Sequence, residues 1–144
     1  PIATLKNYYY VYHPSESNPS KDPLVVRISA GPACSSLYSW LYSKGPFIFN
    51  PYTHDFRLNP NNWNKQANVL FIEGPAGVGF ATDRTGVAKN ILMINMLLST
   101  ITIYAFYAKF PELKDQELYL SGEQYAGITI PRVAKLIVEK NNDR

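Results

Sequence analysis

The chain has 144 residues, of which 46% are apolar and 14% aromatic, enough for the buried core of one compact domain, which excludes a disordered protein. Its formal net charge of +3 comes from dispersed lysines and arginines, and no basic stripe marks a nucleic-acid surface. Cys34 is the only cysteine, which excludes a disulfide within the chain and a cysteine-based metal cluster.

Short apolar runs between Gly, Pro and Asn turns predict the strands. The run at 69–73 is apolar without alternation, which predicts a strand covered on both faces. Residues 50–64 are rich in Asn and Pro and are predicted to form an irregular surface segment. The other predicted strands span residues 8–12, 24–29 and 117–121.

Helical segments are predicted between and after these strands. Residues 91–108 form one, and the stretch after Gly127 places Val133, Ala134, Ile137 and Val138 on one side of another. Alternation of short buried strands with helices predicts the α/β class, with a mostly parallel sheet that carries helices on both faces.

The segment 91–108 holds 18 residues without a charge, between Lys89 and Lys109. Its length meets the lower limit for a membrane span, but its Asn, Ser and Thr residues favour burial in protein. A helix that is apolar nearly all round needs cover on more than one side. We therefore expect another surface to lie against it, with membrane proximity left open.

Residues 122–127 read Gly-Glu-Gln-Tyr-Ala-Gly between a predicted strand and a predicted helix. This is the frame of a nucleophile elbow, in which small residues allow a sharp turn around a central nucleophile. Here the central residue is Gln124, whose carboxamide nitrogen cannot be activated to attack an acyl carbon. The alternative interpretation is a tight turn before a helix, without chemistry.

Five segments, in order, resemble the serine carboxypeptidase family. That family reads a strand ending N-G-G-P-G-C-S-S, then E-x-G-P, W-N-x-x-A-N-x-L-F-x-E-S-P-A-G-V-G-F-S, F-P-E and G-E-S-Y-A-G. The resemblance implies an α/β-hydrolase-like fold, with residues 1–144 as a single truncated domain whose C-terminal strands are missing. The matching segments here are Pro23-Leu-Val-Val-Arg-Ile-Ser-Ala-Gly-Pro-Ala-Cys-Ser-Ser-Leu37, Gly45-Pro-Phe47, residues 63–80, Phe110-Pro-Glu112 and residues 122–127.

The resemblance also implies roles for single positions. Gln124 stands where the family has its acylated serine, and Gly31 and Tyr125 match the two donors of the oxyanion hole. Ala30 and Ala33 stand where the family has glycines, and each adds a methyl group near the ligand. Loss of the nucleophile of a serine hydrolase costs about six orders of magnitude in rate, so no turnover is expected.

The substrate-binding positions depart from the family as well. Ser29 and Ser43 match an asparagine and a glutamate that help bind the substrate's C-terminal carboxylate, and only Glu123 of that set is retained. The family's catalytic aspartate and histidine follow the elbow and are expected beyond residue 144. The two histidines here, His13 and His54, precede it in polar turn segments, where we expect solvated loop residues.

These observations lead to the hypothesis of a catalytically inactive, carboxypeptidase-like protein that acts as a structural or accessory subunit of a larger assembly. Partner chains are expected to cover the edge of the 117–121 strand and the 91–108 helix. The alternatives are a processed chain of an active carboxypeptidase and a carboxylate-binding module that uses the remaining oxyanion donors. No metal, cofactor or nucleic acid is expected. The resemblance favours a secretory or lysosomal location, with an organellar membrane complex as the alternative.

Overall fold

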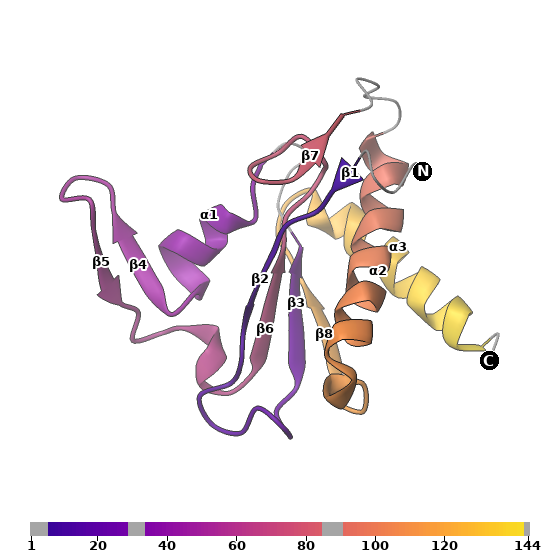
Figure 1. Cartoon of the computed structure of the whole chain (residues 1–144), viewed down its shortest axis with the longest axis horizontal. Coiled ribbons are helices and arrows are strands. Elements are labelled where there is room, and N and C mark those ends of the chain that lie inside the picture. The colour runs from indigo at the N-terminus through magenta and orange to yellow at the C-terminus, as the bar shows by residue number, and fades with distance from the viewer. Residues whose placement is uncertain (1–5, 29–33, 85–90, 143–144) are drawn as a thin grey trace.

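The computed structural model describes residues 6–28, 34–84 and 91–142, with the backbone alone for Lys6 and for residues 91–99. A four-stranded sheet in the order β2-β6-β3-β8 lies at its centre (Figure 1). β3, β6 and β8 are parallel, and β2 pairs with β6 in the antiparallel sense. The mostly parallel α/β sheet is thus confirmed. Its strands are β2 (Tyr10–His13), β3 (Leu24–Ile28), β6 (Asn68–Ile72) and β8 (Leu118–Ser121).

Helices cover both faces of this sheet. On one face a short helix, α1, continues into the π-helical turn η2, and two long helices, α2 and α3, pack on the other face (Figure 1). The 3₁₀ turns η3 and η4 precede β6 and β8 respectively. The bounds are α1 (Leu37–Ser39), η2 (Trp40–Lys44), η3 (Trp63–Lys65), α2 (Ile91–Lys109), η4 (Pro111–Leu113) and α3 (Ala126–Asn142).

The alternation of side chains along β3 separates two cores. Leu24, Val26 and Ile28 are buried in the larger core with Phe106 of α2 and Val133 of α3. A smaller core on the α1 face contains Val69 and Phe71 of β6, with Val25, Trp40 and Trp63 packed against it. All five residues of β6 are buried, as the continuous apolar run predicts for a strand covered on both faces.

The segment predicted to be irregular contains regular structure instead. β4 (Phe47–Asn50) and β5 (Asp55–Leu58) form an antiparallel hairpin that projects from the body (Figure 1). The turn between them includes His54 at φ 55°, and the rings of Phe49 and Phe56 lie 5.1 Å apart. Every residue of β5 is exposed, so no burial pattern marks this strand in the sequence.

The strands differ from the prediction in two respects. β2 begins at Tyr10, two residues later than predicted. A further two-stranded pair joins β1 (Lys6–Asn7) to β7 (Thr82–Asp83), segments that are far apart in the sequence. Pairing of this kind depends on the tertiary arrangement and leaves no local signal.

Both long helices expose apolar residues that the sequence predicted to be covered. In the described half of α2, Ile103 and Phe106 are buried whereas Ile101 is exposed, so this half does present a solvated side. In α3, Val133 is buried but Val138 is 57% exposed, which makes the apolar stripe narrower than predicted. Within the described residues, none of the helices combines the length and apolar character needed to cross a bilayer.

Candidate functional site

The turn from β8 into α3 has the shape of the predicted elbow. Gln124 lies at its apex with φ 53°, a left-handed conformation that is uncommon for a residue with a side chain. The next turn closes at once, because Gly127 N donates to Gln124 O at 3.0 Å. A Cβ atom on Gly122 would overlap Ala126 and lie 3.1 Å from Ile28 O, so this position requires glycine. The sharp strand-to-helix turn is therefore confirmed.

A cavity of about 430 Å³ opens beside this turn, at the carboxyl ends of β3 and β8. Glu123 and Gln124 line it, whereas Tyr125 and Ser43 are not among its lining residues. Two predicted positions, Gly31 and Ser29, lie outside the described residues, as do Ala30 and Ala33. The described lining consists of Arg27, Cys34, Ser35, Ser36, Tyr38, Ser39, Glu123 and Gln124.

Arg27 is the charged residue at the centre of this site. It is only 4% exposed, and its Nη2 lies 2.9 Å from Oε1 of Glu123. Its Nε donates to Ser39 Oγ at 3.3 Å, and its Nη1 donates to Ser121 Oγ at 3.2 Å. The guanidinium also lies 5.7 Å from the ring centroid of Trp63. A buried guanidinium with partners from three elements is held in one position.

Arg27 was not among the site residues predicted from the sequence. The available signal was one cation inside the otherwise apolar run Leu-Val-Val-Arg-Ile, where a charge is costly unless it is paired. The partner of Arg27 has no local signal in the sequence, because Glu123 is 96 positions away. The pairing of β3 with β8 brings the two side chains together. The side chain of Glu123 is 56% exposed, so solvent screens its attraction to Arg27.

A second carboxylate, that of Glu73, holds the loops around the site. Glu73 is fully buried directly after β6. It accepts hydrogen bonds from Ser35 Oγ and, at 2.7 Å, from Phe80 N. Ser36 Oγ donates to Ile72 O at 2.6 Å. The segment that follows the exposed Cys34 is thereby fixed against the end of β6.

The remaining predicted residues lie away from the cavity. Ser43 Oγ donates to Ser39 O at 3.2 Å, within the helical segment that carries both. His13 is half-buried, and its Nε2 accepts a hydrogen bond from Trp40 Nε1 at 2.7 Å, so the prediction of a solvated loop residue was wrong. Burial lowers the pKa of His13 below its usual value. His54 is exposed in a turn, as predicted.

The chemistry available in the described part of the site is limited. No set of three or more His, Cys, Asp or Glu side chains among the described residues converges as metal ligands. The apex residue, Gln124, is exposed and carries a carboxamide. The site therefore combines a paired cation, several hydroxyl groups and a strained turn with an amide in place of a nucleophile.

Comparison with known proteins gives consistent matches. The profile of the serine carboxypeptidase family matches residues 3–144. The lysosomal protective protein of Mus musculus is 39% identical over 142 residues, which is 93% of this chain and 28% of that protein. Serine carboxypeptidase-like 26 of Arabidopsis thaliana is 37% identical over 140 residues, 94% of this chain and 30% of that protein.

A solved structure also matches. The crystal structure of a prohormone-processing carboxypeptidase from Saccharomyces cerevisiae superposes with a TM-score of 0.80 and 30% sequence identity. The match covers 94% of this chain and 30% of that one. The chain thus spans less than a third of the length of these proteins.

Proposed function

The chain belongs to the serine carboxypeptidase family, and we propose that it is a catalytically inactive member, which acts as a structural or accessory subunit of a larger assembly. The observation that carries the proposal is Gln124, at the apex of the elbow with φ 53°. Its amide nitrogen is delocalised into the carbonyl group and does not become a nucleophile beside a base. Loss of this nucleophile alone lowers the rate by about six orders of magnitude.

The ion pair next to Gln124 supports the same proposal. Arg27 holds the carboxylate of Glu123 at 2.9 Å, so the one retained member of the family's carboxylate-binding set is already engaged. Of the two serines at the other matching positions, Ser29 lies outside the described residues, and Ser43 donates to its own helix and is absent from the cavity lining. An anionic substrate group at the elbow would have to compete with Glu123 for Arg27.

The accessory role needs surfaces for partners. β8 is an edge of the described sheet, and Tyr119 on it is 52% exposed. An uncovered edge strand offers unpaired backbone groups to other chains. We propose that a second chain, or more of this chain, covers β8 and the exposed side of α2 near Ile101. We also propose a lysosomal or secretory location, in line with the name of the mouse relative.

Native mass spectrometry of the protein isolated from its source, run beside labelling with a fluorophosphonate serine probe, tests this proposal. We expect the chain to travel with other polypeptides and to remain unlabelled. The variant Gln124→Ser in the same assembly is the matched comparison, because labelling of this variant alone would identify Gln124 as the block. A labelled wild-type chain, or one that travels only with a fragment carrying the family's aspartate and histidine, would instead identify a processed peptidase.

A second candidate function is a carboxylate-binding module. The cavity of about 430 Å³ beside Gln124 favours it, because the guanidinium of Arg27 has more N–H donors than its three described partners use. The test is binding of a short peptide with a free C-terminus against the same peptide amidated. Tighter binding of the free peptide, strengthened in Glu123→Gln, would support the module, and equal binding would exclude it.

A further inference from the structure

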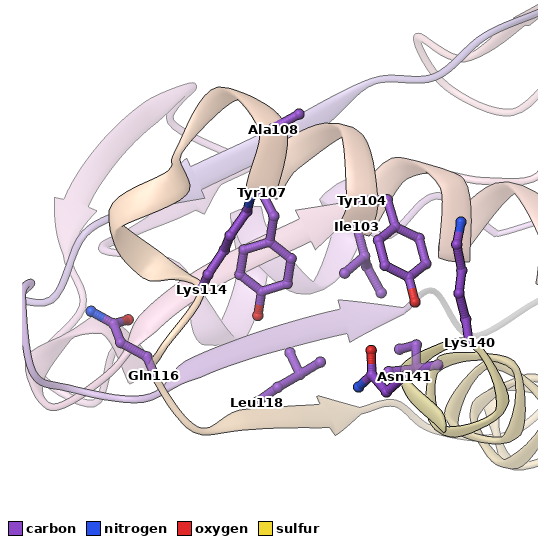
Figure 2. A pocket seen from close by; sticks show the side chains of 10 residues that line it. Ile103, Tyr104, Tyr107, Ala108, Lys114, Gln116, Leu118, Lys140 and Asn141 are labelled. Atoms are coloured by element: carbon purple, nitrogen blue, oxygen red, sulfur yellow. The ribbon is translucent and has the colours of Figure 1, made fainter. Parts of the chain in front are cut away.

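A second cavity lies far from the elbow. It encloses about 550 Å³ between the C-terminal halves of α2 and α3, over the first residue of β8 (Figure 2). Its apolar floor is formed by Ile103, Leu118 and Ile137. Volumes of about 300–1,000 Å³ with an apolar lining are typical of small-molecule sites.

The charged groups described in the lining of this cavity are both cationic. Lys114 and Lys140 line it, and none of the lining residues that the structure describes is acidic. Lys140 comes from α3 and points toward α2 (Figure 2), with its Nζ 4.2 Å from the ring centroid of Tyr104. A cation beside an apolar floor, without a carboxylate in the lining, attracts a ligand of opposite charge.

One hydroxyl group in the cavity lacks a partner. Tyr104 Oη is buried and has no hydrogen bond in the described structure. Figure 2 shows the hydroxyl pointing from α2 toward α3, on the side where Asn141 and Lys140 lie. A buried hydroxyl without an acceptor is unfavourable, and a rotation of the Tyr104 ring that brings its Oη to the cavity would let an oxygen of a ligand accept the hydrogen bond.

Tyr107 adds a second donor. Its ring lies next along α2, with the hydroxyl directed toward β8 and Leu118 (Figure 2). A tyrosine phenol is protonated at neutral pH and can donate a hydrogen bond, and burial raises the pKa of Tyr107 further. Two phenol donors and two ammonium groups thus surround one apolar floor.

We propose that this cavity binds a small amphiphilic carboxylate, with the carboxylate between Lys140 and Tyr104 and the apolar body over Ile103 and Leu118. The ligand carboxylate accepts the hydrogen bond of Tyr104 and pairs with Lys140. The apolar body is removed from water by the floor. This site shares no residue with the elbow cavity and does not depend on the role of Gln124.

The first experiment titrates the intact protein with 4-phenylbutyrate and, separately, with the neutral 4-phenylbutanamide, by calorimetry. The two probes share an apolar body and differ in charge. We expect the carboxylate to bind at least about tenfold more tightly than the amide. Equal affinities, or no binding of the carboxylate at millimolar concentration, would overturn the proposal.

Variants then locate the site. Tyr104→Phe removes only the hydroxyl and Lys140→Gln only the charge, and each should weaken binding of the carboxylate about five- to tenfold. Lys135→Gln is the control, since Lys135 lies on the same helix, is 74% exposed and pairs with Glu139 at 3.6 Å. Unchanged affinity in both Tyr104→Phe and Lys140→Gln would exclude the site.

A measurement on the wild-type protein guards against variants that fail to fold. Nuclear Overhauser effects from the phenyl protons of the bound probe should reach the methyl groups of Ile103 and Leu118. Contacts with Tyr38, which lines the elbow cavity, would place the probe there instead and overturn the assignment.

Discussion

The two faces of the central sheet bury different chemistry. On the α1 face, β3 contributes Arg27 and β2 contributes His13, and each has a partner within the protein. On the α2–α3 face, the core is apolar, and the cations Lys114 and Lys140 lie around a cavity whose described lining contains no acidic residue. The buried Arg27, which has an ion pair and two hydrogen bonds, forms part of the folded structure, whereas the exposed Lys140, whose described partner is the ring of Tyr104, remains available to a ligand.

Replacement of Arg27 should have the largest effect on stability. Arg27→Ala leaves two serine hydroxyls without their donor and a void under Trp63, so the free energy of unfolding should fall by about 2–4 kcal/mol. Urea unfolding measures the change. Arg57→Ala on the exposed strand β5 is the control and should stay within about 0.5 kcal/mol. Similar values for the two variants would refute a structural role for the buried guanidinium.

A methyl group at the elbow should have the next largest effect. Gly122→Ala places a Cβ atom against Ala126 and Ile130, so β8 and α3 must move apart at a cost of about 1–3 kcal/mol. Gly127→Ala is the matched control, because a Cβ atom there meets open space within a helix and should stabilise the protein by up to about 1 kcal/mol. Equal stability of the two variants would contradict the close packing of Ala126 and Ile130 against Gly122.

His13 should make stability depend on pH. Its pKa is lowered in the folded state from 6.5, so its contribution is present above pH 6.5 and is lost as the pH falls through the lowered value. Protonation also removes the acceptor for Trp40, at a cost of about 1 kcal/mol. The free energy of unfolding of the wild type and of His13→Asn, measured at neutral and at mildly acidic pH, gives this pH-dependent contribution. His54→Asn, at an exposed turn, is the control variant.

The smallest effect is expected on the other face. Lys140→Gln should change the free energy of unfolding by less than about 0.5 kcal/mol, because Lys140 is exposed and serves the cavity rather than the core. Thermal unfolding measures the change. A loss as large as that of Arg27→Ala would show that the two faces do not differ in the way proposed.

Local patterns account for the parts of the fold that could be predicted. The run at 69–73 and the turn at 122–127 carry their signals within a few residues, and the structure places β6 and the elbow within one residue of prediction. The hairpin of β4 and β5 was missed because its strand β5 buries none of its side chains. His13 was misjudged because Trp40, its partner, lies in another segment.

The sequence by itself determined the α/β class, the family resemblance and the amide at the apex of the elbow, since each depends on residue identity and short-range order. The tertiary structure alone decided that Arg27 meets Glu123, because this contact requires β3 and β8 to pair in one register. It also decided that Tyr104 and Lys140 share a cavity, since two helices bring them together. Charges and hydroxyls acquire partners only when the chain is folded, and their chemistry follows from those partners.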